Sequence, residues 1–394
     1  MKHLKIIFRT ILLLSATHLA VAEARAENKV PVEYYDSVEV SLLTCQPHDE
    51  IYSLYGHTAL RWNDLHQDNA DIAFNWGVFD FHKPHFVARF VFGLTDYELG
   101  GFPYQSFQME YRRFGSMVTE QVLNLTAEEK QKLHQALAEN LQEQNRIYRY
   151  NYFYNNCTTK TRDIIEKCIN GKVQYTERED YAPSFREIIH EMTIHNPWAR
   201  FGNDILLGIK ADKTTTRQEQ EFLPNNLMYD FDHAQIYSNG VYRPMVKERR
   251  IGVPAGIRTV QKGFPASPVL CWCIILFIGL ILFATEWKRK LAFLLWDLLL
   301  MITVGTIGIV LTLMLFSQHP TVSLNLQIIL FNPLPWFFLW HVIKGRGRRF
   351  WQCTAVLAIL FLLGGLLQTY AEGIQCLACC LLLQCYIHLV RIRQ

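Results

Sequence analysis

The composition of the chain changes at about Ser267, and this change constrains the fold more than any other feature of the sequence. From there to the C-terminus five apolar stretches follow one another, namely residues 268–284, 291–316, 326–343, 350–370 and 374–390. Each stretch can cross a bilayer, because a membrane-spanning helix needs roughly 17 to 25 predominantly apolar residues. Residues 267–394 are therefore expected to form an all-α membrane domain of about five transmembrane helices.

The basic residues between these stretches predict the orientation of the helices. With the preceding half of the chain outside the membrane, a five-helix arrangement puts all of them, and the C-terminus, on the cytoplasmic side, as the positive-inside rule requires. They are Lys288, Arg289, Lys290, Lys344, Arg346, Arg348, Arg349, Arg391 and Arg393. The same arrangement places the loop 317–325 and Glu372 on the outer side, where they would face the exported half.

The N-terminus has the order of residues that is typical of a secretory signal peptide. Basic residues precede the apolar run 11–22, and small residues stand around Ala22 and Ala26, so cleavage is expected near one of these two positions. An uncleaved anchor helix would need roughly 18 or more apolar residues, which this run does not reach. Residues 1–26 are thus predicted to be a signal peptide and residues 27–250 an exported domain.

The exported domain is predicted to be of the α+β class, with its strands first. Runs rich in β-branched and aromatic residues predict strands at 38–43, 59–62 and 72–81. Helical patterns then take over, so this part of the chain is expected to form one mixed domain.

Two helices are predicted after these strands. Thr126 and Glu129 have the spacing of a capping box at the start of the first helix. The second helix begins after Asn156, and its apolar residues recur at helical spacing up to a stop signal at Gly171. Cys157 is therefore expected in the first turn of a helix.

The cysteines of the exported half carry the first hint of chemistry. Only Cys45, Cys157 and Cys168 lie there, while the other seven of the ten lie in predicted membrane helices. Three is an odd number in a compartment that permits disulfides, so at least one thiol stays free unless it pairs with another molecule. A disulfide between Cys45 and Cys168 would leave Cys157 as the odd thiol, and the sequence leaves this pairing open.

A cysteine at a helix N-terminus is a candidate nucleophile. The unpaired amides there favour the thiolate and lower the pKa of the thiol. His57, preceded by Gly56, is the candidate base, and Asn75 is the first candidate to orient the imidazole, followed by Asp80. Cys, His and Asn form a papain-like set, and their order His, Asn, Cys along the chain predicts a circularly permuted papain-like (NlpC-like) fold.

Other interpretations of these residues stay open at this point. A single exported cysteine is more often a buried structural residue, and a single histidine is more often a core residue with its hydrogen bonds satisfied. Cys45 competes as nucleophile because it precedes the His57 strand, but it stands in a turn context without a helix amide field.

Metal ions and nucleic acids are not expected as ligands. His82 and His85 lie close together, with His57 and His66 upstream, but the chain has no Cys-x-x-Cys or His-Glu-x-x-His pattern and Pro84 disfavours a helical histidine pair. The net charge is +3, and the exported half has no basic cluster of the kind that binds nucleic acid.

Several segments in order resemble the Lnb family of bacterial lipoprotein N-acyltransferases. In the exported half they are SLLTC (41–45), YSLYGHTALR (52–61), FNWGVFDF (74–81), YNNCTT (154–159), GNDILLG (202–208), Asp212 and FLP (222–224). In the membrane half HPTVSLN (319–325) and FNPL (331–334) continue the resemblance. It covers nearly the whole mature chain.

The resemblance implies that His57 and Cys157 are the catalytic histidine and cysteine, while Asn75 as orienting residue is inferred from the strand order alone. Candidate substrate-binding residues are Tyr55, Arg61, Asp204, Asp212 and His319. For Asp204 and Asp212 a helix cap or a buried ion pair is an equal alternative, and for His319 so is a loop-capping role.

The activity implied by the resemblance is acyl transfer in the inner membrane of a bacterium, by a multi-pass protein whose catalytic domain lies in the periplasm. A phospholipid or a lipoprotein would donate the acyl chain, a diacylated lipoprotein would accept it, and no cofactor would be needed. A membrane-anchored papain-like peptidase or amidase acting on cell-wall peptides is one alternative, although five helices exceed what anchoring needs. A non-catalytic lipid-binding envelope protein is the other.

Overall fold

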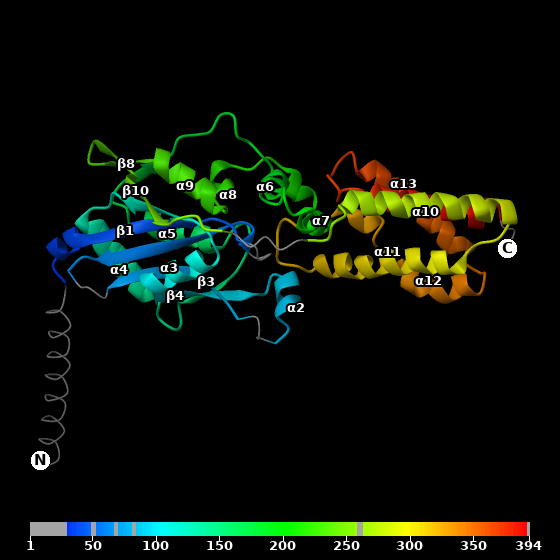
Figure 1. Cartoon of the computed structure of the whole chain (residues 1–394), viewed down its shortest axis with the longest axis horizontal. Helices are drawn as coiled ribbons and strands as arrows, with labels where there is room; N and C mark the ends of the chain where they lie inside the picture. Colours follow the sequence, from blue (N-terminus) through cyan, green and yellow to red (C-terminus); the bar gives the residue numbers. More distant parts are fainter. Residues whose placement is uncertain (1–29, 49–52, 67–69, 81–83, 258–262, 392–394) are drawn as a thin grey trace, which may run out of the picture.

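A computed structural model of the chain describes residues 30–48, 53–66, 70–80, 84–257 and 263–391 (Figure 1). The predicted signal peptide lies outside these residues, as does His82. A mixed α+β domain occupies one end of the long axis and a bundle of apolar helices the other (Figure 1). At this level the predicted fold class is confirmed.

A seven-stranded sheet forms the centre of the N-terminal domain, with the strand order β10-β5-β1-β2-β3-β4-β6 and antiparallel pairing between neighbours. The strands are β1 (Val38–Cys45), β2 (His57–Asp64), β3 (Asp71–Val78), β4 (Asp96–Pro103), β5 (Val118–Leu123), β6 (Ile147–Arg149) and β10 (Val246–Val253). A separate three-stranded sheet consists of β7 (Lys172–Gln174), β8 (Gln235–Ser238) and β9 (Val241–Pro244). Strands β1 and β2 contain the predicted segments 38–43 and 59–62, whereas β3 ends at Val78, earlier than the predicted segment 72–81.

Successive side chains of the large sheet point to opposite faces, so each face has its own core. One core joins Leu42, Leu60 and Trp76 to helices α4, α5 and α9, and the other joins Leu43 and Ala59 to helix α3. The helices are α3 (Tyr104–Arg113), α4 (Ala127–Asn140), α5 (Cys157–Cys168) and α9 (Pro224–His233). The helix that begins with Cys157 is therefore packed against the central strands.

Local sequence explains where these two helices begin. The predicted capping box of α4 is present, with the side chains of Thr126 and Glu129 each bonded to the backbone of the other. Helix α5 starts because Asn156 caps it, its Oδ1 accepting hydrogen bonds from the amides of Thr158 (2.9 Å) and Thr159 (3.0 Å). The predicted position of Cys157 in the first helical turn is thus confirmed.

Helix α5 ends earlier than the glycine signal predicts. Ile169 is already extended, so the helix stops at Cys168 and not at Gly171. Gly171 has a φ of +128°, and a Cβ atom there would collide with the carbonyl oxygen of Tyr237 in β8. This glycine is therefore required by the close approach of β8.

Shorter helices complete the N-terminal domain, and two of them, α2 and α7, stand at its junction with the membrane helices (Figure 1). The shorter helices are η1 (Val32–Ser37), α2 (Phe86–Val91), α6 (Phe185–Met192), α7 (Pro197–Leu206), η3 (Ile209–Asp212) and α8 (Arg217–Gln220).

Each of the five apolar stretches contains a helix. The elements are α10 (Pro268–Arg289), α11 (Leu294–Met314), η4 (Leu326–Ile329) with α12 (Leu334–Ile343), α13 (Arg348–Gly364), and α14 (Gln375–Tyr386) with the π-helix η5 (Ile387–Arg391). Among the described residues, three helical segments are long and apolar enough to cross a membrane: 268–289, 294–314 and 326–343. The chain is thus membrane-anchored, and five crossings stay a prediction.

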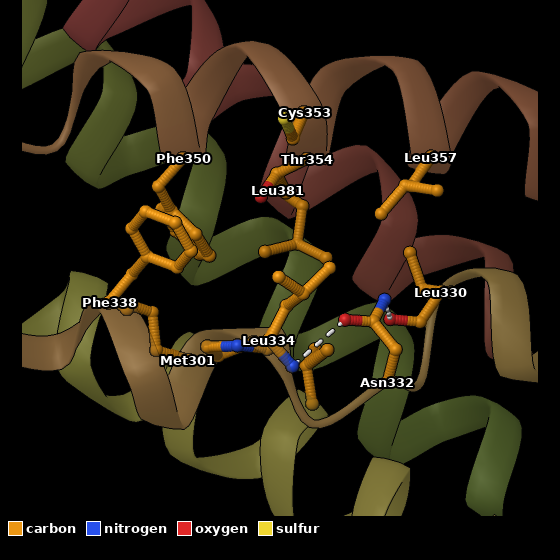
Figure 2. A pocket seen from close by; sticks show the side chains of 12 residues that line it. Met301, Leu330, Asn332, Leu334, Phe338, Phe350, Cys353, Thr354, Leu357 and Leu381 are labelled. Atoms are coloured by element: carbon orange, nitrogen blue, oxygen red, sulfur yellow. Dashed lines mark hydrogen bonds between the residues drawn. The ribbon is translucent and has the colours of Figure 1, made fainter. Parts of the chain in front are cut away.

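A cavity of about 60 Å³ lies among α11, α12, α13 and α14 (Figure 2). Its lining is mostly apolar, and the exceptions are the amide of Asn332 and the hydroxyl of Thr354. Nδ2 of Asn332 donates to the carbonyls of Ile329 (3.1 Å) and Leu330 (3.2 Å), and its Oδ1 accepts from the amide of Leu334 (3.2 Å). Asn332 therefore holds the turn before α12, and the cavity contains none of the candidate catalytic residues.

Helix α2 docks on the loop that follows α11. The Ser317 hydroxyl donates to the carbonyl of Val91 (2.7 Å), and the amide of Gln318 donates to the carbonyl of Phe92 (3.0 Å). Across the junction, Glu372 forms an ion pair with Arg200 of α7 at 2.7 Å. The loop 317–325 and Glu372 thus face the N-terminal domain, as predicted.

The C-terminal end of α7 is bound by amide side chains of the membrane domain. The last carbonyls of a helix have no partner within it, and three membrane-domain side chains donate to them here. The pairs are Asn325 with Ile205 (2.7 Å), Gln327 with Asp204 (2.7 Å) and Gln368 with Leu207 (3.1 Å). At Gly208, whose amide donates to the carbonyl of Thr321 (2.9 Å), the two backbones approach so closely that a Cβ atom would collide with the loop.

Candidate active site

Three elements bring His57, Asn75 and Cys157 together. His57 is the first residue of β2, Asn75 lies on the neighbouring strand β3, and Cys157 is the first residue of α5, which packs on both strands. All three side chains are half-buried. The His57 and Cys157 side chains each act on the pKa of the other through charge and hydrogen bonding.

The contacts of Asn75 determine which nitrogen of His57 carries a proton. Oδ1 of Asn75 accepts a hydrogen bond from the backbone amide of Gly77 at 2.7 Å, so this atom must be the amide oxygen. The same oxygen lies 2.8 Å from Nε2 of His57, which must therefore donate its proton. Nδ1 is left unprotonated in the neutral ring and can accept the proton of the thiol.

The environment of Cys157 favours the thiolate. Burial by itself raises the pKa of the thiol, but the charge of His57 and its hydrogen bond outweigh burial. The Thr58 backbone and the Thr158 hydroxyl act in the same direction, and the pKa falls to about 7. In return, the Cys157 charge and the hydrogen bond of Asn75 raise the pKa of His57 above its ordinary value, against the effect of burial. The pair is thus arranged as an activated nucleophile and its base.

Alkylation of Cys157 by iodoacetamide is expected to follow this low pKa. Because the thiolate is the reactive form, the rate should rise roughly tenfold per pH unit below pH 7 and level off above it. In His57→Ala the midpoint should move above that of an ordinary cysteine, about 8.5, since burial remains while the imidazolium charge is gone. Mass spectrometry of the Cys157 peptide measures both profiles, and coinciding midpoints would rule out the interaction.

Gly77 is required by the contact between His57 and Asn75. A Cβ atom on Gly77 would lie 2.8 Å from Oδ1 of Asn75 and 2.8 Å from Cε1 of His57. We expect Gly77→Ala to displace both side chains and to lower the activity about 100-fold, the effect of a misplacement of about 1 Å. Gly202→Ala is the matched control, because nothing lies within 4 Å of a Cβ atom there. Equal activities of the two variants would contradict this role.

The other two exported cysteines are not placed for catalysis. Cys45 is the last residue of β1, not part of a turn as expected, and lies in the core beside α3. Cys168 is the last residue of α5 and lies in the core on the opposite face of the sheet, and both thiols are buried and free. The disulfide between them that the sequence left open is therefore not formed. Burial raises the pKa of Cys45 far above the ordinary range, so this thiol is a poor nucleophile.

Several tyrosines lie close enough to Cys157 for its charge to act on their phenols, in addition to the larger effect of burial. Tyr55, a predicted substrate-binding residue, packs edge-on against Tyr152 with ring centroids 5.1 Å apart, and its hydroxyl accepts a hydrogen bond from Asn203 of α7 (2.7 Å). Burial is the main cause of the raised pKa of Tyr152, and the charge of Cys157 also raises it. Tyr55 thus links the neighbourhood of Cys157 to the junction, and its contact with substrate stays a prediction.

The guanidinium of Arg61 contacts other residues of the domain and not His57. Its guanidinium bonds both carboxylate oxygens of Asp71 at 2.8 Å, bonds Glu120 at 2.9 Å, and lies 3.9 Å above the ring of Tyr104. These contacts tie strands β2, β3 and β5 together. A substrate-binding role of Arg61 is a prediction that no contact in the structure supports.

Asp204 and Asp212 belong to one buried ion-pair network. Arg186 donates to Asp204 (2.7 Å) and to Asp212 (2.6 Å), and His190 lies 2.9 Å from Asp204. The buried ion pair, which the sequence left as an alternative, is the arrangement present. A contact of either carboxylate with substrate stays a prediction.

The remaining candidates lie at the edge of the site. Nε2 of His319 is 3.0 Å from the carbonyl oxygen of Phe90, so the ring ties the outer loop to α2. This contact agrees with the loop-capping role that was the alternative to substrate binding. Asp80, the second candidate for the orienting residue, is exposed, while Asn75 holds the contact with His57. Within the described ranges, no group of three or more His, Cys, Asp or Glu side chains could hold a metal ion.

Sequence reasoning missed several residues of the site. Gly77 lies two residues after Asn75 in β3, and a glycine inside a strand was a usable signal that another group approaches the backbone closely. Tyr97 and Tyr150, whose pKa values are raised first by burial and in part by the Cys157 charge, come from segments with no motif. The pairing of β4 with β3 on one side and with β6 on the other brings them to the site.

Comparison with known families agrees with this division of the chain. A family model described as the Lnb N-terminal periplasmic domain matches residues 33–191, and one described as the Lnb transmembrane domain matches residues 259–394. No curated protein and no solved structure matches the chain, so the permuted papain-like fold stays a prediction. The two domain matches lie in the expected order and together span most of the chain, which therefore belongs to the Lnb family.

Proposed function

We propose that this membrane-anchored protein transfers a fatty acyl chain from a glycerolipid ester to the N-terminal amine of a diacylglyceryl-cysteine lipoprotein, through a thioester on Cys157. One observation carries the proposal: a half-buried thiol with a pKa of about 7 lies beside His57, whose proton position is set by Asn75. Membership of the Lnb family and the junction with the membrane helices support a lipid ester as the substrate.

In the first half of the reaction the thiolate of Cys157 attacks the ester carbonyl. A C–S bond forms, the C–O bond to the glycerol breaks, and the His57 imidazolium gives its proton to the departing alkoxide. The backbone amide of Cys157 is suited to the negative charge that develops on the carbonyl oxygen. Asn156 occupies the next two amides of the helix, whereas the Cys157 amide has no acceptor among the described residues. The products are a thioester and a lyso-lipid.

In the second half the lipoprotein amine attacks the thioester. A C–N bond forms as the C–S bond breaks, and neutral His57 takes the proton that the amine loses, which restores the starting ion pair. The product is an amide on a triacylated lipoprotein. Each proton is carried by His57, so no cofactor enters the cycle.

The junction supports a membrane substrate over a soluble one. A peptidase acting on cell-wall peptides needs only a tether, whereas here α2 and α7 are both bonded to the loops at one end of the membrane helices. Holding the catalytic residues next to the end of the membrane helices raises the effective concentration of reactants whose acyl chains are confined to the bilayer.

Mass spectrometry of a lipoprotein N-terminal peptide tests the proposal. Cells that lack their own N-acyltransferase would express this chain, and an empty vector is the control. We expect a third acyl chain in amide linkage only when the chain is present. Free fatty acid in place of the amide would mean that water is the acceptor, and an unchanged diacyl peptide with cleaved cell-wall fragments would favour the peptidase.

A further inference from the structure

Four aromatic side chains form a continuous row whose middle lies near Cys157 and whose two ends lie at α2, because Phe79 stacks on Phe86 of that helix (5.9 Å) and Phe90 belongs to it. We define the aromatic row as Phe79, Tyr97, Tyr150 and Phe90. Ring centroids are 4.7 Å apart between Phe79 and Tyr97, 4.1 Å between Tyr97 and Tyr150, and 6.4 Å between Tyr150 and Phe90, and all three pairs are stacked. The rings come from four separate segments of the chain, so only the fold assembles the row.

The middle of the row lies near the nucleophile, since Tyr97, Tyr150 and Cys157 all pack against the same core of the large sheet. Tyr97 and Tyr150 are close enough to Cys157 for its charge to act on both phenols, in addition to the larger effect of burial. Both rings are half-buried, so part of each remains open to a ligand.

The Phe90 end of the row lies at the membrane domain. Phe90 belongs to α2 and is 39% exposed, and its ring centroid is 6.1 Å from that of His319 in the loop after α11. Because α11 is long and apolar enough to cross a membrane, this loop marks the level at which a lipid leaves the bilayer. Phe316, just before the loop, is 74% exposed and continues the apolar surface.

We propose that the donor lipid's acyl chain lies along the aromatic row when its ester carbonyl is at Cys157, so that Phe90 and its neighbours select long-chain donors. This inference rests on the proposed function. An ester that rises out of the bilayer to reach the thiol takes its first methylenes with it, and exposing these to water is unfavourable in proportion to their area. Because the ring faces stack on one another, it is the apolar ring edges, which extend from the membrane to the thiol, that cover those methylenes.

Acylation of the full-length protein by two donors tests the row. Phosphatidylcholine with two palmitoyl chains in mixed micelles needs the row, whereas p-nitrophenyl acetate needs only the thiol and its base. We expect Phe90→Ala to lower the rate of thioester formation from the phospholipid about tenfold or more and to leave the acetate rate within twofold. Phe90→Leu, which keeps an apolar side chain, should retain most of the phospholipid rate.

Phe102→Ala is the matched control, because Phe102 is 43% exposed on β4, the strand that also carries Tyr97, but does not belong to the row. It should leave both rates unchanged. Equal phospholipid rates in Phe90→Ala and in the wild type, with a normal thioester in both, would overturn the inference alone. A wild type that reacts with the acetate and never with the phospholipid would overturn the proposed function and the inference together.

Discussion

Replacing Cys157 by alanine is expected to abolish acyl transfer, with a loss of roughly three orders of magnitude or more, because no other group can form the covalent intermediate. The nearby hydroxyl of Thr158 cannot take over, since it is already 3.1 Å from Thr58 and has no imidazole of its own. The intact protein should gain the mass of one acyl chain in the presence of donor lipid alone, and Cys157→Ala should not.

Cys168→Ala is the matched control for this variant. Cys168 lies at the other end of the same helix, is buried and is free, so its removal makes the same chemical change in α5 without touching His57. Its activity should stay within a few-fold of the wild type. A Cys157→Ala protein that keeps a tenth or more of the activity would remove the thiol from the mechanism, and the lipid-binding alternative would then gain support.

Replacing Arg186 by methionine is expected to destabilise the junction by about 3–5 kcal/mol, the range for breaking a buried ion pair from one side. Arg186 is 2% exposed and bonds two carboxylates, and Asp204 is fully buried. Without the guanidinium, the Asp204 carboxylate would keep only its 2.9 Å contact with His190 among the described side chains. The carbonyls of Leu207 and Gly208 would lose a donor as well.

Thermal unfolding of the detergent-solubilised protein, together with proteolysis, measures this effect. Unfolding of a two-domain chain need not be two-state, so the protease susceptibility of the segment around α7 is the more direct readout. Arg250→Met is the control, since Arg250 pairs with Glu39 and Glu248 at the surface, where such pairs contribute about 0–1 kcal/mol. Equal losses of stability in the two variants would contradict the prediction that the buried Arg186 network contributes more than a surface ion pair.

Local signals in the sequence were sufficient for the elements that carry the chemistry. The capping box at Thr126 and the asparagine before Cys157 act over a few residues, so they predicted where α4 and α5 begin. The contact between His57 and Asn75 could be anticipated because consecutive short strands usually pair. The division between a mixed domain and apolar helices followed from composition alone.

Contacts between distant segments could not be predicted in this way. Asp204 and Asp212 looked like candidates for a substrate site because their partner, Arg186, precedes them by a whole helix and a loop. Arg61 stands in a motif segment, yet its side chain bonds Glu120 from a strand much later in the chain. Pairings of this kind depend on tertiary packing, on which a single sequence carries no local signal.

The binding of α7 by Asn325, Gln327 and Gln368 places unequal evolutionary constraints on the two halves of the protein. The membrane domain contributes side chains to these bonds, whereas the other half contributes only main-chain carbonyls, which every residue possesses. Mutational drift at Ile205 or Leu207 leaves those bonds in place, but a single substitution at Gln327 removes one. A chimera that joins the N-terminal half of one homologue to the membrane half of another should therefore keep these three bonds as long as its membrane half retains the three amides.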